Sequence, residues 1–146
     1  MAYRVLLDVN ICLDLLLNRK PHVLYSGQIF EAGEKGFIKL VISSLCFDTL
    51  FYVMRPVLGV RKSIEKLQLL LGYVHVGMIN HNTVQQALDS GWSDLEDALH
   101  YYCALQNDCL YIITRNIKDF KTATQSVIIL TPEEFLGSNH FLGEKR

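Results

Sequence analysis

The sequence predicts an α/β fold, a three-layer sandwich in which helices cover both faces of a central, mostly parallel β-sheet. Short apolar runs alternate along the whole chain with longer segments of helical periodicity, an order typical of parallel sheets. Several of these runs are continuously apolar, as strands are when both faces of the sheet are buried. No repeat, linker or low-complexity stretch interrupts the pattern, so residues 1–146 are predicted to form one domain.

Five strands are predicted from these runs. They span residues 3–7, 39–42, 73–76, 110–113 and 127–129. The first strand leads directly into Asp8, and the fourth leads into the polar cluster Thr114-Arg115-Asn116. Ligands of open α/β sheets bind at the carboxyl ends of the strands, so these two strand ends are the first places to look for a site.

The helices are predicted from capping residues, chain breakers and apolar spacing. They are expected from a cap at Asn10 to about residue 17, over about 22–35, from Ser43 or Ser44 to a break at Pro56, over 60–71, from Asn80 or Asn82 to 88, over about 93–107, and from Thr131 onward. In the segment 60–71, apolar residues spaced four, three and four apart indicate an amphipathic helix. The tail from about residue 137 is expected to be frayed.

The composition limits the class of protein. The formal net charge of -1 excludes nucleic-acid binding through overall charge, so any such binding needs a local basic patch. We expect no signal peptide and no membrane span, because no apolar run approaches the roughly 20 residues required. The four cysteines lie singly among apolar neighbours and are expected to be reduced core thiols of a cytoplasmic protein. The histidines, His100 among them, lack metal-ligand spacing and are expected to be packing or surface residues.

Three acids lie at the start of the helix predicted over 93–107. Ser93 and Glu96 fit a capping box, which explains Glu96 without chemistry. Asp94 then occupies the first helical position, and Asp97 follows on the same helix face, with Cβ atoms roughly 5–6 Å apart. Two readings remain open: these acids favour the positive end of the helix dipole, or they share a cation that offsets their repulsion.

Asp8 carries the second part of the site prediction. A carboxylate after a buried strand is costly to bury, so it is expected at the exposed carboxyl end of that strand. If the strands before Asp8 and Thr114 are both central and parallel, their ends face one crevice, together with the helix that carries Asp94 and Asp97. Converging carboxylates repel one another, and hard oxygen ligands of this kind suit Mg²⁺ or Mn²⁺.

Other α/β enzymes fit the sequence less well. A haloacid-dehalogenase-like phosphatase needs a second acid two residues after Asp8, where this chain has Asn10. A receiver domain needs an acceptor Asp after a middle strand, and neither middle strand supplies one. P-loop and G-x-G-x-x-G motifs are absent from the sequence, which argues against ATP or dinucleotide chemistry.

The ordered motifs resemble the PIN domain family, the nuclease fold of VapC-type toxins. They are the opening acidic motif at 7–11 with Asp14 beyond it, D-x-E-D-A at 94–98, T-R-N-x-x-D-F at 114–120 and T-P-E-E-F-L at 131–136. The resemblance covers nearly the whole chain and implies a Mg²⁺- or Mn²⁺-dependent endoribonuclease, the toxin of a type II toxin–antitoxin pair.

The resemblance also implies roles for individual residues. Asp8 and Asp97 are expected as metal ligands, and Asp94 as a further acid. Asn116 stands where many members carry their fourth acid, with Asp119 three residues on. Thr114 and Asn116 are expected to orient water or carboxylate, with Asn10 in support. One departure is that Thr49, beside Asp48, stands where many members carry a Glu. The alternative is therefore a weakened or inactive PIN-like module that binds RNA or a protein partner.

Contacts with partners are predicted less specifically. Arg115 and Lys118 flank the predicted pocket and are candidates for RNA binding. A positive run on a neighbouring helix either contacts RNA or is a solvated face; it comprises Arg55, Arg61, Lys62 and Lys66. A cognate antitoxin is an implied partner, and the apolar face of 60–71 allows either a homodimer or ordinary core packing.

Overall fold

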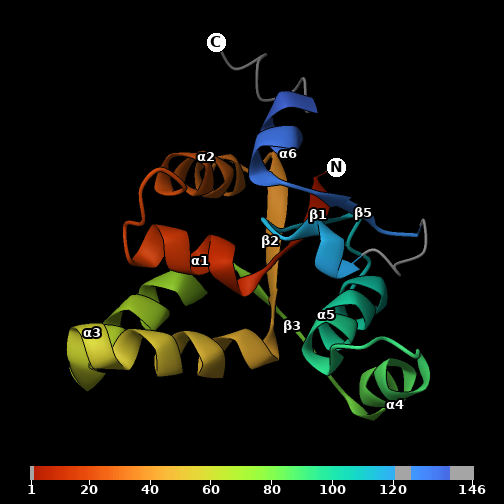
Figure 1. Cartoon of the computed structure of the whole chain (residues 1–146). Coiled ribbons are helices and arrows are strands. Elements are labelled where there is room, and N and C mark those ends of the chain that lie inside the picture. Colours follow the sequence, from red (N-terminus) through yellow and green to blue (C-terminus); the bar gives the residue numbers. More distant parts are fainter. Residues whose placement is uncertain (1, 121–125, 139–146) are drawn as a thin grey trace.

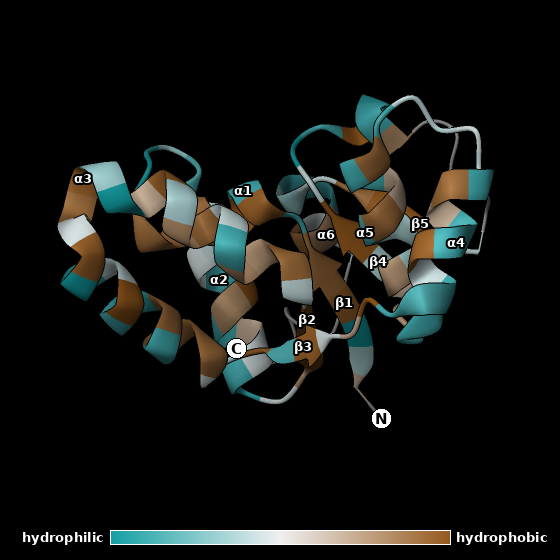
Figure 2. Ribbon diagram, turned by 90° about the horizontal axis from the view of Figure 1, so that it is seen from below, coloured by the Kyte–Doolittle hydropathy of each residue, from teal (hydrophilic) through white to brown (hydrophobic). Residues whose placement is uncertain are grey.

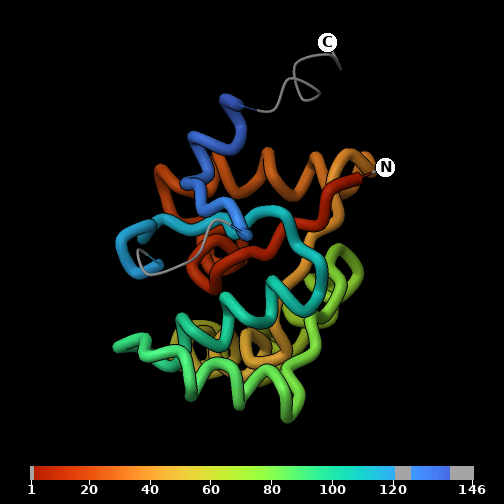
Figure 3. The backbone as a smooth tube through the Cα atoms, turned by 90° about the vertical axis from the view of Figure 1, so that its right-hand side faces the viewer, coloured from red at the N-terminus to blue at the C-terminus, as the bar shows by residue number. Residues whose placement is uncertain are grey.

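The computed structural model describes residues 2–120 and 126–138, and its centre is a sheet of five parallel strands (Figure 1). The strands are β1 (Tyr3–Leu7), β2 (Ile38–Ser43), β3 (His75–Gly77), β4 (Tyr111–Ile113) and β5 (Ile128–Leu130). Their spatial order is β3-β2-β1-β4-β5, so β1 is the central strand. Figure 3 shows the red N-terminal strand beside the cyan segment that contains β4. The predicted parallel sheet is confirmed.

Helices lie on both sides of this sheet. They are α1 (Val9–Leu16), α2 (Val23–Glu34), α3 (Ser44–Leu71), α4 (His81–Asp89), α5 (Leu95–Gln106) and α6 (Pro132–Ser138), with the 3₁₀ helix η1 (Ile117–Phe120). The predicted capping box of α6 is present: Glu134 N–H donates to Thr131 Oγ1, and Thr131 N–H donates to Glu134 Oε1. Of the tail predicted to be frayed, Gly137 and Ser138 end α6, and residues 139–146 lie outside the described residues.

Alternate residues of the central strands supply two hydrophobic cores. Val5, Leu7, Leu40, Ile42 and Ile113 face α1, α2, α3 and α6. Leu6, Val41 and Ile112 face α5 and η1. Figure 2 shows the hydrophobic strands between the layer of α1, α2 and α3 and the layer of α4 and α5. The predicted three-layer arrangement is therefore present, because successive strand residues point to opposite faces.

The four cysteines are buried free thiols, as predicted. Across the described residues, no helix combines the length and the apolar character that a membrane crossing requires.

One predicted helix boundary in α3 is wrong. Pro56 does not end a helix; it lies inside α3, and the chain leaves helical geometry only at Gly59, with φ 84° and ψ 168°. The proline removes a single N–H donor, whereas the backbone of Gly59 redirects the helix. Two interpretations were left open for the apolar face of 60–71, and ordinary core packing applies to Leu67 alone of the four residues, since Val60, Ile64 and Leu71 are exposed. Three of the four side chains considered for a homodimer are therefore at the surface.

We expect Gly59→Ala to lower the free energy of unfolding by about 1–3 kcal/mol, because its backbone conformation is essentially restricted to glycine. No heavy atom lies within 4 Å of an added Cβ at Gly59 or at the helical residue Gly27. Gly27→Ala is the matched control and should stabilise the protein by about 0.5–1 kcal/mol. Urea denaturation of both variants measures the two effects. Equal stability of Gly59→Ala and the wild type would mean that this backbone relaxes without strain.

Candidate functional site

The site begins where the adjacent strands β1 and β4 end. The parallel register pairs Leu7 with Ile113, so Asp8 and Thr114 leave the sheet side by side. The buried Thr114 hydroxyl donates to Asp8 Oδ2 at 2.7 Å, and Asp8 Oδ1 accepts from Val9 N–H at 2.8 Å. Asp8, not Asn10 as predicted, is therefore the N-cap of α1, because the helix begins two residues earlier than the sequence suggests. Asn10 lies, half-buried, in the first turn of α1.

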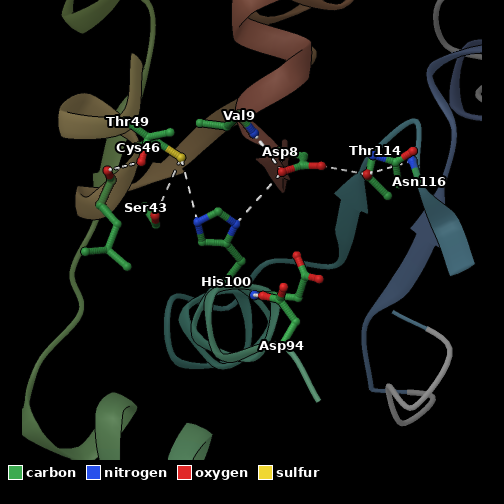
Figure 4. Close-up of polar contacts among 11 residues, drawn as sticks. Asp8, Val9, Ser43, Cys46, Thr49, Asp94, His100, Thr114 and Asn116 are labelled. Atoms are coloured by element: carbon green, nitrogen blue, oxygen red, sulfur yellow. Dashed lines mark hydrogen bonds and ion pairs between the residues drawn. The ribbon is translucent and has the colours of Figure 1, made fainter. Parts of the chain in front are cut away.

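Among the described residues, no lysine or arginine forms a salt bridge with Asp8, whose side chain is 13% exposed. The nearby titratable base is His100, whose Nδ1 lies 3.9 Å from Asp8 Oδ1 (Figure 4). The positive end of the α1 dipole and two hydrogen bonds stabilise the carboxylate instead.

The helix α5 brings the second group of acids. Asp94 is its N-cap, with extended backbone geometry, and its carboxylate accepts from Asp97 N–H at 3.0 Å. The predicted capping box of Ser93 and Glu96 is therefore wrong: the helix starts at Leu95, one residue later than that box requires. Glu96 is exposed in the first turn. In Figure 4, Asp94 lies at the end of α5 that faces Asp8.

Asp97 shows that these acids affect one another. Its pKa is raised from an ordinary 3.8 to about 7, first by burial and then by the charges of Asp94, Asp119, Asp8 and Glu96. Acids at the end of β1, at the start of α5 and in η1 thus share one electrostatic environment. Within the described residues, however, no three His, Cys, Asp or Glu side chains are close enough to hold one metal ion. This arrangement fits an ion that keeps much of its water shell and takes one or two carboxylates, as Mg²⁺ does.

The loop after β4 is organised by Thr114. Its Oγ1 accepts from Asn116 N–H at 3.0 Å, and Asn116 C=O in turn accepts from Asp119 N–H at 3.0 Å. Asn116, Lys118 and Asp119 are exposed. The loop therefore presents their side chains to solvent beside the acids of α5.

Arg115 is directed elsewhere. Its guanidinium forms two hydrogen bonds with Asp14, at 2.9 and 3.1 Å, and Arg19 approaches the same carboxylate at 3.8 Å. Asp14 is fully buried on α1, so it requires such partners. The ion pair anchors the loop after β4 to α1. It occupies the guanidinium that the sequence analysis considered for RNA binding. The sequence signal for this ion pair was Asp14 itself, a charged residue among the apolar residues of the first helix.

The start of α3 adds no carboxylate to the site among its described contacts. Asp48 is exposed, and Thr49 Oγ1 donates to the Leu45 carbonyl of its own helix at 3.4 Å. Two other side chains lie near Asp8 that the sequence did not single out for the site, namely His100 and, behind it, Cys46. The available signal was the spacing of Asp97 and His100, which are three residues apart on one face of α5.

The raised pKa of Asp97 predicts a pH-dependent stability. Since its pKa is about 7 in the folded protein and near 3.8 ordinarily, the folded state keeps a proton that the unfolded state releases between these values. Stability should therefore fall as the pH rises from about 4 to about 7. Asp97→Asn removes this penalty and should melt at a higher temperature than the wild type at pH 8, with the difference closing by pH 4.

Asp108→Asn is the matched control for this melting experiment. Asp108 is exposed and has a left-handed backbone (φ 58°), which asparagine also tolerates. Its melting temperature should follow that of the wild type at both pH values. A constant difference between Asp97→Asn and the wild type across the pH range would contradict the assigned pKa.

Comparisons with known proteins agree with this architecture. The family model of the PIN domain matches residues 4–118. Ribonuclease VapC1 of Aquifex aeolicus (strain VF5) is 26% identical over 137 residues, which cover 90% of this chain and 92% of the relative. VapBC-1 from nontypeable Haemophilus influenzae aligns with a TM-score of 0.68 and 19% identity, over 89% of this chain and 98% of that chain.

A second solved structure has the same fold. VapBC2 from Rickettsia felis, bound to a DNA fragment from its promoter, aligns with a TM-score of 0.65 and 19% identity, over 86% of this chain and 96% of that chain. The family match runs from the first strand into η1 and includes the strand ends and the helix start that carry the acids. This chain belongs to the PIN domain family.

Proposed function

We propose that this protein is an endoribonuclease that depends on Mg²⁺ or Mn²⁺. The observation that carries the proposal is the environment of Asp97, where burial and four neighbouring acids raise its pKa to about 7. A cluster of acids without matching lysines or arginines is costly in a protein, and a bound divalent cation would relieve that cost. Membership of the PIN domain family and the likeness to Ribonuclease VapC1 support the same reaction.

Each candidate residue then has a distinct role. Asp8 and Asp97 would hold the cation, with Asp94 as a further acid at its edge. When bound, the cation would supply Lewis-acid stabilisation of the phosphate and lower the pKa of a water molecule. Thr114 fixes the orientation of Asp8 through its hydroxyl. Asn116 would orient water beside the scissile phosphate, supported by the half-buried Asn10.

Two further side chains concern the substrate. Asp119 contributes negative charge around Asp97, and would help to retain the cation. Lys118 is exposed on the same 3₁₀ helix and would contact the RNA backbone. Arg115 would contribute less to RNA binding than Lys118, because its guanidinium is paired with Asp14. Because the salt dependence of binding grows with the number of phosphates that basic side chains neutralise, binding through so few basic side chains should weaken only modestly with added salt.

We further propose that the protein is a toxin held inactive by a cognate antitoxin protein. The support is the likeness to chains from VapBC assemblies and from a toxin–antitoxin complex of Klebsiella pneumoniae. The competing function is a PIN-like module that binds RNA without cleaving it. This alternative is favoured by Thr49, which has no carboxylate and whose hydroxyl is bonded to its own helix.

Cleavage of structured RNAs in Mg²⁺ or Mn²⁺ tests the nuclease. Asp8→Asn and Asp97→Asn should each reduce the cleavage rate at least roughly a hundredfold, by removing a ligand of the catalytic ion. Asp108→Asn should cleave like the wild type, and chelation by EDTA should abolish activity. RNA binding without cleavage by the wild type would instead support the inactive module. Activity equal in all variants would identify a contaminating nuclease.

Co-expression tests the toxin. The wild type should arrest growth when expressed alone, and expression of the small reading frame beside its own should restore growth and co-purify with it. Asp8→Asn should be harmless alone yet still bind the partner, because the substitution changes the chemistry of the site and preserves the fold. Growth arrest by Asp8→Asn equal to that of the wild type would separate toxicity from the nuclease and refute this part of the proposal.

A further inference from the structure

A row of buried polar contacts connects α3 to Asp8. Ser43 Oγ lies 3.6 Å from Cys46 Sγ, and Cys46 Sγ lies 4.0 Å from His100 Nε2. On the opposite side of the ring, His100 Nδ1 lies 3.9 Å from Asp8 Oδ1. Figure 4 shows these contacts as a continuous path from Ser43 through the imidazole to Asp8 and on to Thr114. The path runs along the carboxyl ends of the strands, from β2 past β1 to β4.

His100 is the unusual member of this row. Only 2% of its surface is exposed, and its Nδ1 atom makes no hydrogen bond with any of the described residues. A buried polar atom left without a partner costs about 1–3 kcal/mol, so its retention needs an explanation. The acceptor it faces is Asp8 Oδ1, just beyond hydrogen-bonding distance.

In the contact between Cys46 and His100, the donor and acceptor roles depend on which ring nitrogen carries the hydrogen. Burial raises the pKa of the Cys46 thiol to about 12, so the thiol keeps its hydrogen at neutral pH. Ser43 donates to the sulfur, and the thiol can in turn donate to Nε2. The ring hydrogen then resides on Nδ1, the atom that faces Asp8.

We propose that His100 is a positioning residue for Asp8, whose Nδ1–H donates to Oδ1 and holds the carboxylate in one orientation, with Cys46 fixing the tautomer of the ring. This inference rests on the proposed function, since an oriented Asp8 matters for a cation site. A carboxylate offers about four lone-pair sites. Val9 N–H and Thr114 Oγ1 occupy two of them, and His100 would occupy a third, which leaves one site, on Oδ2, for a cation.

The chemistry of α3 explains why such a residue is useful here. Thr49 and Asp48 bring no carboxylate into the described site, so the charge that holds a cation comes from few groups. A single carboxylate binds a cation more tightly when its outer contacts fix its direction, and the loss of such contacts typically weakens metal binding about 10–100-fold. His100 provides this contact without adding to the repulsion among the acids.

The experiment combines Mn²⁺ binding with the tautomer of His100 in the full chain. His100→Phe removes both ring nitrogens and should raise the dissociation constant of Mn²⁺ roughly tenfold or more. Electron paramagnetic resonance measures this constant. His100→Asn places an amide N–H where Nδ1 stood and should recover most of the affinity. Long-range ¹H–¹⁵N spectra should show the Nδ1–H tautomer in the wild type, and Cys46→Ala should lose that preference. Circular dichroism checks the fold of each variant.

The outcomes separate this inference from the proposed function. Mn²⁺ binding abolished by Asp8→Asn but unchanged by His100→Phe would overturn the positioning role and leave the metal site intact. Equal Mn²⁺ binding by the wild type and Asp8→Asn would overturn the metal site, and the role of His100 with it. An Nε2–H tautomer in the wild type would overturn the role of His100 and Cys46 alone. If His100→Phe fails to fold, His100→Asn and Cys46→Ala decide the question through affinity and tautomer.

Discussion

The hydrogen bond from the Thr114 hydroxyl to Asp8 Oδ2 connects residues 106 positions apart in the chain. It forms because β1 and β4 are parallel neighbours in register, and because the Asp8 amide donates to the Ile113 carbonyl at the point where both strands end. Thr114 also donates its amide to Leu130 at the end of β5 and accepts from the Asn116 amide. One buried hydroxyl-bearing residue thereby sets the relative positions of the first acid and the loop with Asn116.

The two aspartates at either end of α1 are treated in opposite ways by the fold. Asp14 is fully buried, and two arginines neutralise its charge. Asp8, six residues earlier, is stabilised by hydrogen-bond donors and the helix terminus, with no lysine or arginine paired to it among the described residues. A structural carboxylate is usually paired when it is buried, whereas a carboxylate that serves a cation must keep its charge available. The contrast within one helix separates the structural acid from the one that we propose to bind a cation.

The sequence predicted the fold class because buried parallel strands and amphipathic helices leave distinct patterns of apolar residues. It also located Asp8 and Thr114, since a polar residue directly after a buried strand has only the sheet edge to occupy. It did not predict where α3 changes direction. The spacing of apolar residues gives no information on the backbone of Gly59, and Pro56 is the residue expected to end a helix. The sequence also predicted Ser93 instead of Asp94 as the cap of α5, since either residue type can fill that position and the spacing of Ser93 and Glu96 fits a capping box.

Contacts between distant segments were the least accessible part. The pairing of Arg115 with Asp14 and the approach of His100 to Asp8 depend on how α1 and α5 pack on opposite faces of the sheet. Local sequence gives no rule for such distances. The sequence predicted that His100 is either a packing residue or a surface residue, and the structure shows that it is buried. Its neighbour Asp8 could be identified only once β1 and α5 were placed together.

The outer strands of the sheet, β3 and β5, are three residues long each. A short border strand exposes few unpaired amides and carbonyls, so another polypeptide finds little template for adding a strand of its own. Sheets with long, flat borders are prone to intermolecular growth into aggregates. Because both outer strands are short, the protein should resist aggregation through its sheet at high concentration. Its contacts with other molecules are then expected to use helical surfaces.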